Sequence, residues 1–179
     1  MIEAVISAAR EVGDAALGQW RHLRDGGELD QWRKADESLV SEVDVETDRR
    51  LKAILGALDP EAGWLSEETA DHPERLSRRR IWCVDPIDGT RDFLRGRPGW
   101  AVSIALVEAG RPVLGVLYAP ARDELWVATR GGGASLNGAV VQAGNRIALS
   151  GARVPATSLP KVDADLAMVH QPNSIALRM

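Results

Sequence analysis

The chain has 179 residues, of which 45% are hydrophobic and 27% charged, a balance typical of a soluble globular domain rather than of a disordered or membrane-spanning chain. Its 26 acidic residues outnumber its 22 lysines and arginines. The net charge of -4 therefore offers no basic field to nucleic acid or an anionic membrane, and we expect neither as a partner. The single cysteine, Cys83, cannot form an internal disulfide, and no export signal or membrane-spanning run is recognisable, which favours a cytoplasmic location.

Two amphipathic helices are predicted in the first third of the chain. Apolar residues recur at steps of three and four from Ile2 to Leu23, and this pattern should end near Gly26-Gly27. A second pattern begins after Ser41 and stops at Leu58. The polar stretch Lys34–Ser38 between them is interpreted as a linker, with the alternative that Lys34 lies near a substrate phosphate. We therefore expect two helices before any sheet.

A mostly antiparallel sheet is predicted to follow. Short strand candidates at Gly63–Ser66 and Ile81–Val84 both run directly into carboxylates. An antiparallel meander is then predicted from three β-type runs separated by short turns, at 101–107, 113–119 and 124–129. The expected fold class is α/β, in the narrower sense α+β, with two helices packed on the sheet.

Residues 1–150 are expected to form an N-terminal αβ domain that carries any metal and phosphate site. Gly131-Gly132-Gly133 is interpreted as a flexible connection, because no Lys-Ser/Thr pair follows it as in a phosphate-binding loop. Residues 151–179 are expected to be a linker and the start of an incomplete C-terminal αβ portion. That portion would contain a strand at Leu166–His170 and a helix starting after Asn173 or Ser174.

The most informative segment is Asp85-Pro86-Ile87-Asp88-Gly89-Thr90, which directly follows a predicted strand. Pro86 biases Asp85 towards an extended conformation, and Gly89 permits backbone angles closed to other residues, so the turn can direct Asp85 and Asp88 to one point. Carboxylate and carbonyl oxygens in such a turn suit Mg2+ better than zinc. The N–H groups of Gly89 and Thr90 would then face a phosphate beside the metal. In the alternative interpretation, both aspartates are ordinary turn residues.

Two further acidic positions can combine with this turn. Glu67-Glu68 follows the other short strand and can deliver a carboxylate to the same sheet edge, although such pairs are commonly just solvated. Asp44 ends the run Ser41-Glu42-Val43-Asp44, which matches a capping box at the start of the second helix. The functional alternative makes Asp44 the acceptor that, through Thr90, orients and deprotonates an attacking water.

At these motifs the sequence resembles the inositol monophosphatase superfamily, a group of Mg2+-dependent, lithium-sensitive phosphatases. The most specific element is the run from Trp82 to Phe93, which is similar to the family's Asp-Pro-Ile/Leu-Asp-Gly-Thr signature in its usual strand context. Leu65–Glu68 and Leu39–Asp44 match two upstream family motifs in the right order. The resemblance extends from about Lys34 to Gly138.

The resemblance implies a fold and a metal centre. The fold would be the N-terminal part of an αβαβα layered sandwich, and the cofactor would be two or three Mg2+ ions. Glu67, Asp85 and the carbonyl of Ile87 would bind the first ion. Asp85 and Asp88 would bind the second.

The resemblance also implies how a small phosphomonoester substrate is bound and attacked. Asp44 and Thr90 would be the catalytic pair that activates the water. The substrate would lie against Glu67, Ile87, Asp88, Gly89 and Thr90. Family membership also allows a homodimer.

Within the superfamily, Ser66-Glu67-Glu68, Arg91 after Thr90, and Lys34 look more like the 3'(2'),5'-bisphosphate nucleotidases. The implied reaction is Mg2+-dependent hydrolysis of 3'-phosphoadenosine 5'-phosphate to AMP and phosphate, with Lys34 and Arg91 added to the substrate-binding residues. One alternative is an inositol monophosphatase, which converts inositol phosphate to inositol. Another is a truncated, inactive remnant that binds metal or phosphate. It is considered because the family's C-terminal half, with the Trp-Asp motif that completes the second metal site, does not follow in these 179 residues.

Overall fold

The computed structural model describes residues 1–35 and 37–145. Met1–Val141 form one compact unit, and Gln142–Met179 belong to a second. Every helix and strand named below belongs to the first unit. The domain boundary expected at residue 150, the strand expected at Leu166–His170 and the helix expected after Asn173 lie outside the described residues.

The first unit contains two long helices, one short helix, two 3-10 turns and nine strands among the described residues. The helical elements are α1 (Ile2–Arg24), α2 (Glu42–Leu58), η1 (Pro73–Ser77), α3 (Thr90–Leu94) and η2 (Pro120–Arg122). The strands are β1 (Gln31–Arg33), β2 (Leu39–Ser41), β3 (Gly63–Ser66), β4 (Arg80–Asp88), β5 (Ala101–Glu108), β6 (Arg111–Ala119), β7 (Glu124–Thr129), β8 (Gly133–Leu136) and β9 (Ala139–Val141). None of these helices is both long enough and apolar enough to cross a membrane.

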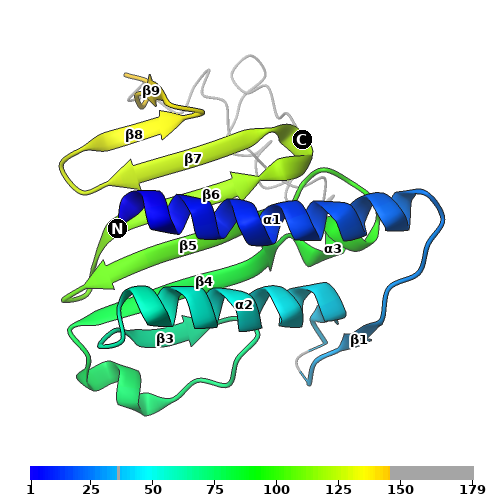
Figure 1. The fold of residues 1–179 in the computed structure, drawn as a ribbon, viewed down its shortest axis with the longest axis horizontal. Coiled ribbons are helices and arrows are strands. Elements are labelled where there is room, and N and C mark those ends of the chain that lie inside the picture. The colour runs from blue at the N-terminus through cyan, green and yellow to red at the C-terminus, as the bar shows by residue number, and fades with distance from the viewer. Residues whose placement is uncertain (36, 146–179) are drawn as a thin grey trace, which may run out of the picture. The chain divides into compact units, whose positions relative to one another are not determined.

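Seven of the strands form one sheet, in the order β3-β4-β5-β6-β7-β8-β9. β3 is parallel to β4, and every other neighbouring pair is antiparallel, which confirms the predicted meander. Because β3 and β4 run in the same direction, both strands end at the same edge of the sheet (Figure 1).

Helices α1 and α2 lie side by side on one face of this sheet, as predicted (Figure 1). The apolar stripe of α1 buries Val5, Ala9 and Val12 against the sheet. Strand side chains alternate between the two faces, so Trp82 and Val84 of β4 belong to this core. The close approach of α1 to β6 requires Gly13, because a Cβ atom there would lie 2.6 Å from the ring of Tyr118.

Three parts of the fold differ from the sequence-based expectation. β1 and β2 form a separate antiparallel hairpin between α1 and α2, so the expectation of two helices before any sheet is wrong. β4 does not end at Val84 but continues to Asp88, with an irregularity in its pairing after Asp85. The expectation of a flexible connection at Gly131-Gly132-Gly133 is also wrong. The chain makes a tight turn there, with the Gly132 N–H bonded to Thr129 O at 3.0 Å, and continues into β8 and β9.

Candidate active site

The candidate site is built where β3 ends beside the last part of β4. The parallel register pairs Ser66 with Val84, so Glu67 and Asp85 are the next residue of each strand. The N–H of Glu67 donates to Val84 O at 3.3 Å, which continues the ladder by one bond. The topology of this pair therefore brings the two predicted carboxylates together.

Glu67, Asp85 and Asp88 form a cluster of like charge. Burial, the negative charges of Glu67 and Asp88, and a hydrogen bond with Glu67 together raise the pKa of Asp85 to about 7. Glu67 and Asp88 are exposed, whereas Asp85 is partly buried. A cation placed among these groups would relieve their mutual repulsion.

The segment between β4 and α3 is held by apolar packing on one side and by a glycine on the other. Ile87 and Phe93 are fully buried in a cluster with Trp100, whose ring contacts Phe93 edge-on at 4.9 Å between centroids. Gly89 has φ +94°, and a Cβ atom there would lie 2.5 Å from the carbonyl oxygen of Gly99. Position 89 therefore accepts only glycine without local rearrangement.

Asp44 and Thr90 are in direct contact. The hydroxyl oxygen of Thr90 lies 2.7 Å from Asp44 Oδ1 and 3.0 Å from the carbonyl oxygen of Ile87. The shorter contact identifies Asp44 as the principal acceptor of the hydroxyl proton. The structure thus joins the start of α2 to the end of β4, the proximity on which the functional interpretation of Asp44 depends.

Asp44 also caps α2, so the two interpretations of this residue are compatible. Its Oδ2 accepts hydrogen bonds from both the N–H and the hydroxyl of Ser41, at 2.8 Å for the N–H, which leaves Oδ1 for Thr90. Burial raises the pKa of Asp44 above its usual value, and the hydrogen bonds from Ser41 and Thr90 oppose that rise. A buried carboxylate with an elevated pKa is a suitable proton acceptor near neutral pH.

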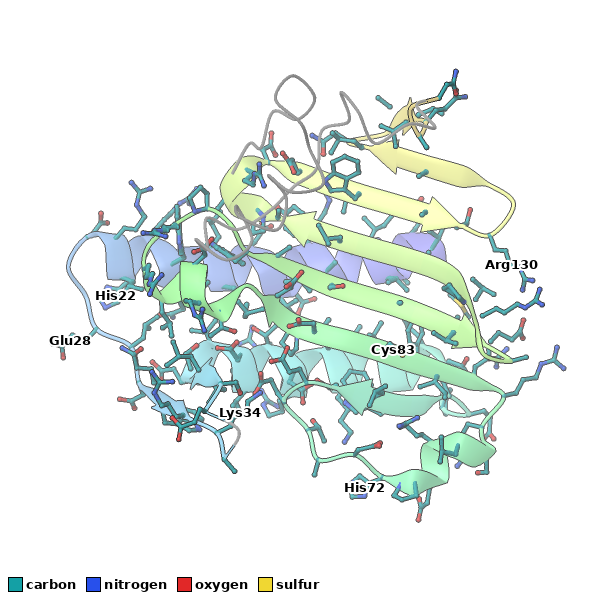
Figure 2. The ribbon with its side chains drawn as sticks, turned by 180° about the vertical axis from the view of Figure 1, so that it is seen from behind. His22, Glu28, Lys34, His72, Cys83 and Arg130 are labelled. Atoms are coloured by element: carbon teal, nitrogen blue, oxygen red, sulfur yellow. The ribbon has the colours of Figure 1, made fainter. Side chains whose placement is uncertain are left out.

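Lys34 contacts the acidic pair Glu67-Glu68, so the expectation that it lies in a mere linker is wrong. It lies in the turn of the β1–β2 hairpin (Figure 2), where its Nζ donates to Glu68 Oε1 at 2.7 Å and to Glu67 O at 3.2 Å. The Nζ is also 3.8 Å from Glu67 Oε1. Burial alone would lower the pKa of Lys34, but the hydrogen bond and charge of Glu68 outweigh it and raise that pKa. The ammonium group therefore stays charged beside the cluster.

Glu67 and Glu68 have different environments although they are adjacent. The side chain of Glu68 is 4% exposed, and that of Glu67 is 50% exposed. Burial raises the pKa of Glu68, and the hydrogen bond and charge of Lys34 oppose the rise. Glu68 therefore anchors Lys34, and Glu67 is the member of the pair that faces Asp85.

Sequence reasoning missed Asp48 entirely. This carboxylate is 6% exposed on α2 and accepts hydrogen bonds from the hydroxyls of Ser66 and Thr69. Its spacing from Asp44 could have indicated it, because residues four apart lie on the same face of a helix and Asp44 was already a candidate.

Arg91 and Cys83 are two further residues that the sequence singles out. Arg91 is exposed on α3 directly after Thr90, and nothing in the described residues shows it meeting the carboxylate cluster. Cys83 is partly buried on β4, and that burial raises the pKa of its thiol. An elevated thiol pKa disfavours the thiolate, which is the reactive form of cysteine.

The donor set fits Mg2+. Across residues 1–35 and 37–145, no three side chains of His, Cys, Asp or Glu converge closely enough to hold a metal ion by themselves. Glu67 and Asp85 instead offer two carboxylates that contact each other. Mg2+ is usually held in this way, by one or two carboxylates with water and substrate phosphate completing the shell.

Comparisons with known proteins identify the family to which the chain belongs. A model of the Inositol monophosphatase family matches residues 1–172. Nus factor SuhB of Xylella fastidiosa is 36% identical over 150 residues, which cover 84% of this chain and 52% of the relative. The 3'(2'),5'-bisphosphate nucleotidase CysQ of Salmonella typhimurium is 38% identical over 133 residues, which cover 73% of this chain and 52% of the relative.

Solved structures show the same fold. An inositol monophosphatase (IMPase) of Thermotoga maritima superposes with a TM-score of 0.80 at 27% identity, covering 97% of this chain and 66% of that structure. An IMPase/NADP phosphatase solved with Mg2+ and phosphate gives a TM-score of 0.79 at 22% identity, covering 98% and 65%, and so supports the fold alone. The chain spans about half the length of the curated relatives that it matches. Because the family model matches nearly the whole chain, whose two helices pack on a mostly antiparallel sheet as in the solved IMPases, the chain belongs to the inositol monophosphatase family.

Proposed function

We propose that this chain carries the metal- and phosphate-binding part of a Mg2+-dependent phosphomonoesterase that hydrolyses 3'-phosphoadenosine 5'-phosphate to AMP and phosphate. The observation that supports this most is the meeting of Glu67 and Asp85 at one sheet edge, next to the hydrogen bond between Thr90 and Asp44. An acidic cluster and a buried carboxylate that can accept a proton adjoin there.

In this proposal, one Mg2+ ion would be held by Glu67, Asp85 and the Ile87 carbonyl. A second Mg2+ ion would be bound by Asp85 together with Asp88. When bound, Mg2+ neutralises phosphate charge, lowers the pKa of water and stabilises the leaving oxygen. The N–H groups of Gly89 and Thr90 hold the phosphate.

The protein's own part in the reaction is to position water and accept its proton. Because the Thr90 hydroxyl donates to Asp44 Oδ1, its lone pairs remain available to accept a hydrogen bond from the attacking water. The proton then passes from the water through the Thr90 hydroxyl to Asp44 Oδ1. Ser41, which bonds to Oδ2, fixes the orientation of the carboxylate during this transfer.

The choice of substrate rests on Lys34 and on the nucleotidase relative. Lys34 is fixed beside Glu67 and Glu68, where its ammonium group can meet a phosphate oxygen next to the metal site. The identity of 38% to a bisphosphate nucleotidase supports the adenosine compound. The likeness to an IMPase of Thermotoga maritima favours the second candidate, an inositol monophosphatase.

The test is phosphate release by the purified chain on 3'-phosphoadenosine 5'-phosphate and inositol 1-phosphate, with Mg2+ or with EDTA. The proposal predicts EDTA-sensitive release from the adenosine compound, and the variant Asp85→Asn should abolish it. Preference for the inositol ester would support the second candidate. Mg2+ binding without release from either compound would instead support the inactive remnant.

A further inference from the structure

Asp48 is a buried carboxylate to which the proposed reaction assigns no role. It lies on α2, one turn after Asp44, and is 6% exposed. A carboxylate in such a position must have its oxygens satisfied by hydrogen bonds, because burying it unpaired is costly.

The partners of Asp48 lie on both sides of Glu67-Glu68. The Ser66 hydroxyl donates to Asp48 Oδ1, and the Thr69 hydroxyl donates to Asp48 Oδ2. The Ser66 oxygen in turn accepts the N–H of Glu68 at 3.2 Å. Hydrogen bonds to an ionised carboxylate are among the stronger ones in proteins. The end of β3 and the loop after it are therefore tied to α2 at two points, one before and one after the acidic pair.

The hairpin that carries Lys34 also contacts this segment, residues 66–69. Lys34 Nζ contacts the carbonyl oxygen of Glu67 and the carboxylate of Glu68. Asp48 thus fixes where the backbone of the segment lies relative to α2. Lys34 neutralises the buried charge of Glu68. Between them, the side chain of Glu67 is left to face Asp85.

Helix α2 connects both halves of the site through two aspartates. Asp44 and Asp48 are four residues apart, which corresponds to about 6 Å along a helix axis. Asp44 is bonded to Thr90, after the end of β4, and Asp48 is bonded to Ser66 and Thr69, at the end of β3. A rigid helix therefore fixes the position of the Glu67 segment relative to that of Thr90.

We propose that Asp48 is a positioning residue that acts through Ser66 and Thr69. It holds Glu67 where this side chain meets Asp85, and so sets the affinity of the site for Mg2+. The part that concerns Mg2+ rests on the proposed function, whereas the part that concerns the position of Glu67 does not.

The first experiment is independent of metal. Amide hydrogen exchange of Glu67 and Glu68 is followed in the metal-free chain for Asp48→Asn and Thr69→Val, with Thr69→Ser as the matched control that keeps the hydroxyl. Both hydrogen-bond variants should exchange at least about tenfold faster at these two amides, with the β5 and β6 amides unchanged. Unchanged exchange at Glu67 and Glu68 would overturn the proposal.

The second experiment measures the Mg2+ dissociation constant by titration calorimetry with the metal alone. Removing a partner of a metal ligand typically weakens metal binding about 10–100-fold, and we expect this for Asp48→Asn and Thr69→Val but not for Thr69→Ser. In a Glu67→Gln background the same changes should have little further effect, because their action passes through Glu67. If Asp48 only stabilised the fold, its replacement would weaken Mg2+ binding equally in both backgrounds. That result would refute the positioning role of Asp48.

The two experiments separate the inference from the proposed function. If the unmodified chain binds no Mg2+, the proposed metal site is wrong, and the exchange rates still decide whether Asp48 positions the segment. If the chain binds Mg2+ but Thr69→Val and Asp48→Asn bind it equally well, the proposed metal site stands and the role of Asp48 is refuted.

Discussion

Replacing Gly89 by alanine tests whether the turn after β4 is built as described. Two costs act at this position. Holding a residue with a Cβ atom at φ +94° costs about 1–2 kcal/mol. The new Cβ would also lie 2.5 Å from the carbonyl oxygen of Gly99, and relieving such overpacking against backbone costs about 1–3 kcal/mol. The free energy of unfolding should therefore fall by about 2–5 kcal/mol in Gly89→Ala.

The matched control is Gly110→Ala in the turn between β5 and β6. Gly110 has φ +74°, but a Cβ atom there would meet no other part of the molecule within 4 Å, so only the conformational cost of about 1–2 kcal/mol applies. Urea unfolding of both variants, followed by circular dichroism at equal protein concentration, gives the two free energies. Equal losses in the two variants would show that the Gly99 carbonyl does not crowd position 89, and would refute the argument.

Three further predictions concern the polar groups of the site. Thr90→Val should slow phosphate release by about 100-fold or more, because no hydroxyl then links water to Asp44, while Thr90→Ser should retain most of the rate in the same phosphate assay. The folded pKa of Asp85, about 7, lies above its unfolded value of 3.8, so this group stabilises the metal-free chain below pH 4 and loses that contribution as the pH rises through 7. Converting the difference between the folded and unfolded pKa directly into free energy gives about 4 kcal/mol. Solvent screening of this partly exposed carboxyl reduces that figure to about 1–2 kcal/mol. Urea unfolding at pH 5 and pH 8 should show this loss relative to Asp85→Asn, and an opposite trend would contradict the assignment. Lys34→Met should lower the free energy of unfolding by about 1–3 kcal/mol at pH 8, because it leaves the carboxylate of Glu68 buried without its cation. Lys34→Arg should recover part of the loss in the same urea assay, and equal stability of Lys34→Met and the unmodified chain would show that the pair contributes nothing.

The long elements were predictable from the sequence because their patterns are strong. The apolar stripe from Ile2 to Leu23 marked α1, and the turns between 101 and 129 defined the meander. The Asp85 to Thr90 run identified the position of the site. No local sequence pattern predicted that β3 would pair with β4 in parallel at the sheet edge, because parallel pairing is decided by packing across the whole unit.

The elements that were missed are short or glycine-rich. All three residues of β1 are exposed, so no apolar alternation marks the hairpin that carries Lys34. β8 begins at Gly133, and a glycine run predicts a loop more readily than a strand. Asp48 was missed because a lone aspartate in a helix is usually on the surface, and its burial depends on the hydroxyls of Ser66 and Thr69, which only the fold supplies.

The order of strands in the large sheet has a consequence for how the chain folds. Every strand from β4 to β9 pairs with the one before it in the sequence, and pairings between near neighbours are associated with fast folding. The N-terminal helix is different, because Asp14 on α1 bonds to the hydroxyl of Tyr118, 104 residues away, and closing that long loop is the slower event. All the residues of the candidate site lie between Lys34 and Thr90, so we expect them to assemble from one continuous stretch of chain before α1 docks.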